Sequence, residues 1–77
     1  MSIKAYVLID VEKGETGSVA AELSHMPGVL AADVIFGEHD VVAVIEGDDL
    51  YKLEYIIRNQ IIQTDHVSRT QTLLALH

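Results

Sequence analysis

The chain has 77 residues, no cysteine, and twelve aspartates and glutamates against five lysines and arginines, which gives a formal net charge of −7. Without cysteine there are no disulfides and no thiolate zinc sites, and the basic residues are spread singly rather than in the cluster that nucleic-acid binding requires. No apolar run approaches the ~20 residues of a bilayer span, so we expect one cytoplasmic domain over residues 1–77. A domain this small buries a smaller fraction of its surface on folding than larger domains do, and its stability is marginal. We therefore expect it to self-associate.

The first half of the chain predicts a strand, a short helix and a second strand. Residues 3–11 are rich in β-branched and aliphatic side chains, which favour a strand. The next apolar side chains recur with helical spacing, which predicts a helix over residues 18–25 with Thr16 or Ser18 as its N-cap. A Pro-Gly pair ends this helix, and residues 29–36 predict the second strand.

The second half predicts a strand, a longer helix and a final strand. A Gly-Glu-His-Asp turn leads into a strand over residues 41–46. Residues 47–49, Gly-Asp-Asp, supply a break and an N-cap for a helix over residues 50–62. Residues 67–76, rich in Thr and Leu, predict the fourth strand. The buried stripe of the second helix is expected to be Leu50, Leu53, Ile57 and Ile61.

This order predicts an α+β domain of the ferredoxin-like βαββαβ type, a four-stranded antiparallel sheet with both helices on one face. Side chains alternate between the two faces of a sheet, and in this sequence both sets are largely apolar. In the second strand, Val29 and Ala31 are expected to share a face. Two helices cover only one face of a sheet, so we expect a sheet-to-sheet dimer that buries the other. The second face of the first strand is expected to carry Lys4, Tyr6, Leu8 and Asp10.

The most polar part of the chain is the turn Gly37-Glu38-His39-Asp40. Gly37 allows a close approach to the backbone, and the Asp40 carboxylate can accept hydrogen bonds from an ammonium group, so the turn is a candidate ligand site. An ordinary hairpin connection also favours Gly and Asp, so the pattern alone leaves both interpretations open.

Three hydroxyl side chains lie along the last predicted strand. Ser68, Thr70 and Thr72 are two residues apart and are therefore expected on one face, where they could line a pocket or donate to a ligand carboxylate. Thr is also common in edge strands, and a solvent-facing row explains the pattern equally well.

Patterns for catalysis or metal binding are not found. No two of the four histidines lie three or four residues apart, and we expect His39 to be a solvated turn residue. The acidic residues Glu46, Asp48 and Asp49 are explained by helix capping. The sequence holds no Ser-His-Asp pattern and no phosphate-binding glycine loop, so we expect neither an enzyme nor a bound cofactor or metal.

Several of these features together resemble a known family. The element order, Pro27-Gly28-Val29, the Gly37-x-x-Asp40 turn and the ending Val67-Ser68-Arg69-Thr70-Gln71-Thr72 resemble the RAM domain. This is the amino-acid-binding effector domain of the Lrp/AsnC transcription regulators, and the resemblance covers residues 3–76. Family members also carry an N-terminal helix-turn-helix domain. This sequence starts directly at its first strand, so it resembles a stand-alone RAM domain.

The resemblance implies a homodimer, a higher assembly as a ring of dimers, and amino-acid binding between the dimers. It implies that full-length Lrp/AsnC regulators are partners. From the net charge and the short apolar runs we expect no direct contact with nucleic acid or membrane. Two alternatives share the element order: a small dimeric α+β barrel enzyme, which needs a hollow interior, and an ACT-like ligand sensor, which pairs sheets edge to edge. The implied ligand-binding residues are Gly37, Glu38, His39, Asp40, Ser68, Thr70 and Thr72.

Overall fold

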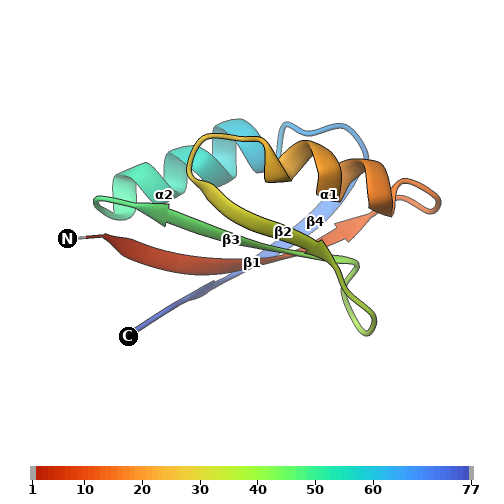
Figure 1. Ribbon diagram of the computed structural model, residues 1–77, viewed down its shortest axis with the longest axis horizontal. Helices are drawn as coiled ribbons and strands as arrows, with labels where there is room; N and C mark the ends of the chain where they lie inside the picture. The colour runs from red at the N-terminus through yellow and green to blue at the C-terminus, as the bar shows by residue number, and fades with distance from the viewer. Residues whose placement is uncertain (1, 77) are drawn as a thin grey trace.

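The computed structural model describes residues 2–76 and has the expected element order (Figure 1). Four strands, β1 Ile3–Val11, β2 Val29–Val34, β3 Val41–Gly47 and β4 Val67–Leu74, form one antiparallel sheet in the order β2-β3-β1-β4. The helices are α1 Thr16–Ser24 and α2 Leu50–Ile56, and α2 continues into the π-helical turn η1 Ile57–Ile61. Both helices lie on the same side of the sheet (Figure 1), which confirms the ferredoxin-like prediction.

The core lies between the helices and the face of the sheet that they cover, called the inner face below. Every second residue of the two central strands is buried there, because alternate side chains point to the same side. Leu23 of α1 and Ile56 of α2 are completely buried against this face. Burial of this apolar surface is the main source of stability in such a domain. The buried positions of the central strands are Ala5, Val7, Ile9, Val11, Val41, Ala43, Ile45 and Gly47.

The buried stripe of the second helix differs from the prediction. Leu53 and Ile61 are buried as expected, but Leu50 is 57% exposed and Ile57 is only half-buried, while Ile56 is completely buried. The π-helical turn explains the change: Ile56 and Ile61 are five residues apart and are both buried. In a regular α-helix five residues make about 1.4 turns and would point the two side chains in different directions. The wider π turn adds one residue and keeps both on the core side.

The predicted N-cap of the second helix is confirmed, and that of the first helix is wrong. Asp49 caps α2 as expected, since its carboxylate accepts a hydrogen bond from the Lys52 N–H at 2.9 Å. The N-cap of α1 is Glu15, and neither Thr16 nor Ser18 takes that role. The Ser18 hydroxyl donates back to the Glu15 carbonyl at 3.0 Å, so it bonds to the first turn without capping it.

Irregular pairing changes which side chains share a face on both edge strands. On β2 the register shifts between Val29 and Ala31, which places Ala31 opposite Val44 on the helix-free face. The expectation that Val29 and Ala31 share a face is therefore wrong. On β4 the register shifts beside Val11, and Ser68 becomes an extra residue. The two-residue alternation that would align Ser68 with Thr70 and Thr72 is interrupted there.

The helix-free side of the sheet, called the outer face below, carries an apolar centre. Tyr6 is 38% exposed and Leu73 is 46% exposed, and the two are paired neighbours on β1 and β4. Tyr6 also pairs with Val44, and Leu8 pairs with Val42. No element within residues 2–76 covers this surface (Figure 1). None of the helices in that range is long and apolar enough to cross a membrane.

Candidate functional site

The connection between β2 and β3, residues 35–40, extends past the end of the sheet on the side away from the helices (Figure 1). The Ile35 N–H donates to the Asp40 carbonyl at 3.0 Å and closes the turn. Gly37 has a φ of +151°, a conformation that other residues rarely adopt, and nothing lies within 4 Å of an added Cβ. Glycine is therefore required here by backbone conformation and not by lack of space.

Asp40 holds this turn against the end of β1. Its N–H donates to the Ile9 carbonyl at 3.0 Å, and its carboxylate Oδ2 accepts from the Val11 N–H at 2.8 Å. The second carboxylate oxygen, Oδ1, makes no hydrogen bond within the described residues. Asp40 is thus anchored by one oxygen and has the other available to a ligand.

Asp10 connects the turn to β4. Its Oδ1 lies 2.9 Å from His39 Nδ1, and its Oδ2 accepts from Arg69 Nε at 3.3 Å. The hydrogen bond with His39 is the main cause that lowers the pKa of Asp10, with a smaller effect of Arg69 and an opposing effect of desolvation. The side chain of His39 is only 22% exposed, so the expectation of a solvated turn histidine is wrong.

The predicted site residues fall into separate groups in the structure. The Ser68 hydroxyl donates to the Asp10 carbonyl of β1 at 3.0 Å and contacts no residue of the turn, whereas Glu38 is exposed in the turn itself. Thr70 and Thr72 pair with Ile9 and Val7, whose side chains are on the inner face, and they do not approach the turn of the same chain. The structure therefore keeps Gly37, Glu38, His39 and Asp40 in one turn, places Ser68 beside Asp10, and leaves Thr70 and Thr72 apart.

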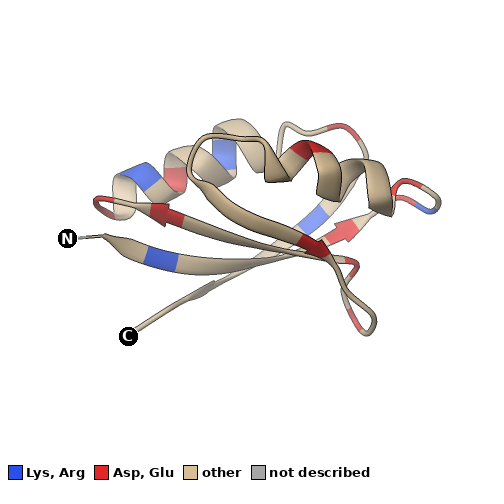
Figure 2. Cartoon of the chain, in the orientation of Figure 1, with Lys and Arg blue, Asp and Glu red and all other residues tan. Residues whose placement is uncertain are grey.

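Two residues of this cluster, Asp10 and Arg69, were not among the predicted site residues. They are direct partners across the β1–β4 pair, where opposite charges attract. The available signal was the antiparallel arrangement itself, because it places the end of β1 beside the beginning of β4. Figure 2 shows that acidic residues on β1, on β2 and in the β2–β3 connection lie at this same end of the sheet.

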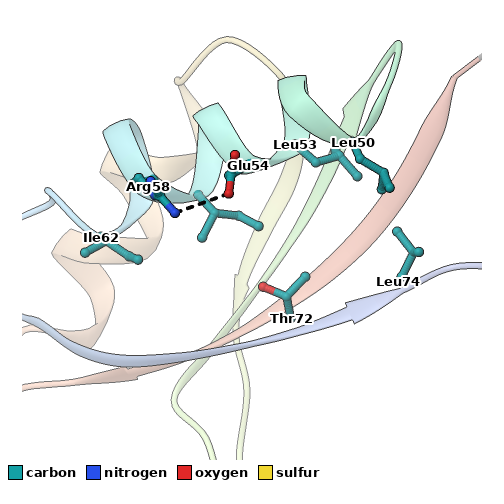
Figure 3. Close-up of a pocket in the computed structure, with 8 residues that line it drawn as sticks. Leu50, Leu53, Glu54, Arg58, Ile62, Thr72 and Leu74 are labelled. Atoms are coloured by element: carbon teal, nitrogen blue, oxygen red, sulfur yellow. Dashed lines mark hydrogen bonds and ion pairs between the residues drawn. The ribbon is translucent and has the colours of Figure 1, made fainter.

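A second concave feature lies between the second helix and β4 (Figure 3). It is a groove of ≈ 420 Å³, which exists because α2 packs over β3 and β1 and leaves the inner side of β4 largely uncovered. At its rim Arg58 donates to Glu54 at 3.2 Å. Of the predicted site residues only Thr72 lines this groove. Its apolar lining is Leu50, Leu53, Ile57, Ile62 and Leu74.

Metal binding has no support in the described part of the chain, since no three histidine, aspartate or glutamate side chains of residues 2–76 are placed to hold an ion. His66 contacts two glutamates, since its Nδ1 lies 2.9 Å from Glu12 Oε1 and its Nε2 lies 3.6 Å from Glu15 Oε1. Each of these contacts is an ion pair when His66 is protonated.

Comparison with known proteins gives a consistent result. The family model described as the Lrp/AsnC ligand binding domain matches residues 4–77. An uncharacterized HTH-type transcriptional regulator of Pyrococcus abyssi (strain GE5 / Orsay) is 30% identical over 70 residues, 91% of this chain and 44% of that protein. The chain thus spans less than half of the length of this curated relative.

Solved structures show the same fold. A crystal structure of a Thermus thermophilus protein has a TM-score of 0.91 at 28% identity, covering 97% of this chain and 94% of that one. A transcriptional regulator of Neisseria meningitidis, solved as a complex with L-Met, has a TM-score of 0.85 at 18% identity, covering 97% of this chain and 50% of that one. Since the family model extends over nearly the whole sequence, this chain belongs to the Lrp/AsnC ligand binding domain family.

Proposed function

We propose that this chain is a non-catalytic effector domain that binds a free amino acid at the β2–β3 turn and influences transcription through a partner regulator in the cytoplasm. The observation that carries the proposal is the partly anchored Asp40, with one carboxylate oxygen bonded to β1 and the other unbonded within the described residues. The Neisseria meningitidis regulator of the same fold, solved with L-Met, supports an amino acid as the ligand class.

The turn offers complementary groups for both charges of an amino acid. The Asp40 Oδ1 would accept from the ligand ammonium in a charge-assisted hydrogen bond. The N–H groups of Gly37, Glu38 and His39 have no acceptor within residues 2–76 and would donate to the ligand carboxylate. The ammonium and the carboxylate of the ligand would thus both find hydrogen-bond partners in the turn, and no catalytic residue is involved. For this reason we propose binding and no reaction.

We further propose that the outer face forms a homodimer by sheet-to-sheet packing. Tyr6 and Leu73 in its apolar centre are 38% and 46% exposed and Val44 is half-buried, while the Lys4–Glu46 pair lies at its edge, as polar residues lie at the rim of interfaces. The β2–β3 turn extends on this same side (Figure 1), so a packed partner would lie beside the ligand.

Binding and assembly would then be coupled. A ligand that binds only the assembled form stabilises it by about 2.7 kcal/mol at a hundredfold excess over its Kd. Thr70 and Thr72 lie on the inner face, so they would contribute to the turn site only from a neighbouring dimer. A ring of dimers is the assembly that would supply them.

The ligand proposal is tested by calorimetric titration of the protein with each of the common amino acids at millimolar concentration, with sedimentation velocity on the same samples. We expect at least one amino acid to bind and to shift the oligomer distribution. Asp40→Asn keeps an oxygen for the Val11 N–H but removes the charge, and we expect it to lower affinity at least tenfold. Glu22→Gln on α1 makes the same change of charge at an exposed position and serves as the control. Absence of binding across the panel would contradict the proposal.

The dimer proposal is tested separately by Val44→Lys. A charge in the middle of the outer face would have to be buried without a partner, and we expect the variant to sediment as a monomer. Val34→Lys is the matched control, because Val34 is exposed and pairs with Val41 on the inner side. If Val44→Lys keeps the mass of the unmodified protein, the outer face is not the interface.

A further inference from the structure

The β2–β3 turn carries an aromatic side chain that does not pack against its own chain. Phe36 is completely exposed and is the most exposed large apolar side chain within residues 2–76. It belongs to residues 35–40, the segment that extends past the end of the sheet (Figure 1). Aromatic side chains are enriched in protein interfaces, because each buries about 150–250 Å² of surface. Phe36 is therefore a candidate anchor for a contact with another molecule.

The groove between α2–η1 and β4 is an apolar hollow in the same chain (Figure 3). Leu50, Ile62 and Leu74 line it and are 57%, 48% and 47% exposed. Its volume is ≈ 420 Å³, whereas an apolar cavity of about 150 Å³ is enough for a benzene molecule. Glu54 and Arg58 line the groove together as an ion pair, so their charges cancel. The groove therefore favours an apolar side chain over a charged ligand.

We propose that Phe36 of one copy of this chain inserts into the groove of a copy in the neighbouring dimer. Every copy has one projecting phenyl group and one groove, so no second kind of protein is needed. The two contacting surfaces are different, and such a head-to-tail contact produces a ring when the rotation between successive units closes. The inference rests on the ring of dimers proposed above and names the side chain that would hold the dimers together.

Two neighbouring residues fit this contact. Glu38 is exposed and lies two residues beyond Phe36, so it would come to lie at the rim of the groove beside Arg58. The Arg58 guanidinium contacts Glu54 through Nη2 only, and its other N–H groups are available to a second carboxylate. Thr72 also lines the groove. Insertion of Phe36 would bring this hydroxyl to the turn of the neighbouring copy, which its own chain does not reach.

The contact is tested by sedimentation velocity of the full chain at millimolar concentration, unmodified and with Phe36→Ser. We expect the unmodified protein to form assemblies larger than a dimer and the variant to remain a dimer, with association between dimers weakened at least tenfold. The far-UV spectrum should be unchanged, because Phe36 is completely exposed. Tyr51→Ser removes an exposed aromatic side chain of α2 outside the groove and should have no effect.

A mixture of two variants tests where the phenyl group is inserted. Leu74→Asp puts a charge into the groove and keeps Phe36, and we expect it to remain a dimer as well. Phe36→Ser keeps the groove, so an equal mixture of the two variants contains intact phenyl groups on one dimer and intact grooves on the other. We expect this mixture to form assemblies larger than a dimer, which neither variant forms alone.

Three results would overturn the proposal: an unmodified protein no larger than a dimer, a mixture that stays dimeric, or a Phe36→Ser variant that sediments as a monomer, which would place Phe36 inside the dimer interface. A Phe36→Ser variant that still forms the larger assemblies would also overturn it and would leave the ring of dimers standing. The ligand and dimer proposals are tested at other positions, Asp40 and Val44, so their failure is distinguishable from failure of the Phe36 contact.

Discussion

Gly28, which joins α1 to β2, should be costly to replace even with alanine. Its φ is +86°, and an added Cβ would collide with Ile56 Cδ1 and lie 3.2 Å from Ile56 Cγ1. The left-handed conformation costs a residue with a Cβ about 1–2 kcal/mol, and overpacking of a core costs about 1–3 kcal/mol. The two effects together predict that Gly28→Ala lowers the free energy of unfolding by roughly 2–5 kcal/mol, a large part of the ~5–15 kcal/mol typical of a domain.

Two other glycines separate these effects. Gly14 has a φ of +88° with nothing within 4 Å of an added Cβ, so Gly14→Ala should cost only the conformational part, about 1–2 kcal/mol. Gly17 lies in α1 without a positive φ and also has open space, so Gly17→Ala should stabilise the protein by about 0.5–1 kcal/mol. From the most to the least stable protein, the predicted order is therefore Gly17→Ala, the unmodified protein, Gly14→Ala and Gly28→Ala.

Urea unfolding followed by far-UV circular dichroism at one fixed protein concentration measures these differences, and the fixed concentration removes the contribution of association. A double-mutant cycle with Ile56→Val identifies the contact, because valine lacks the Cδ1 atom with which the new methyl collides. We expect the two changes together to cost less than their sum by about 1 kcal/mol. The reasoning is refuted if Gly28→Ala costs no more than Gly14→Ala, or if the cycle shows no coupling.

Two predictions concern pH. The hydrogen bond with Glu12 is the main cause that raises the pKa of His66. Protonated His66 therefore stabilises the folded state fully below its ordinary pKa of 6.5, and this stabilisation is lost as the pH rises through the higher folded-state pKa. Urea midpoints measured from about pH 5 to 9 should show this loss, and His66→Asn, which tolerates the positive φ of 75° at this position, should not. The pKa of Asp10 is lowered, mainly by His39, so its stabilisation is present above the ordinary value of 3.8 and is lost as the pH falls through the folded-state pKa. Asp10→Asn should therefore flatten the acid limb of the stability curve, and an unchanged limb would exclude the Asp10–His39 contact as its source.

The fold was predictable because its signals are local. The alternation of β1 and β3 and the breaks at Gly and Pro are visible within ten residues of sequence, and they determine the order of elements. The end of the second helix was not predictable in the same way, since a π turn has no composition signal that distinguishes it from a regular helix. Leu50 and Ile57 were predicted to be buried because an apolar side chain that faces an open groove looks the same in sequence as one in the core.

In the candidate site, too, the local features were predictable and the contacts between distant residues were not. Residues 37–40 were identifiable from the composition of a turn, but the contact between Asp10 and His39 joins positions 29 residues apart and depends on strand register. Arg69 is 59 residues from Asp10 and reaches it only through the β1–β4 pairing. The bulge at Ser68 separated a row of hydroxyls that a regular strand would have kept on one face.

The π-helical turn Ile57–Ile61 also affects how the domain tolerates changes of length. Loss of one residue between Ile56 and Ile61 would leave these two core side chains four positions apart, which is the natural spacing of an α-helix. Both would still face the sheet, and β4 would begin at the same place. Insertions and deletions normally accumulate in surface loops, whereas here we expect a helix in contact with the core to accommodate a single-residue deletion.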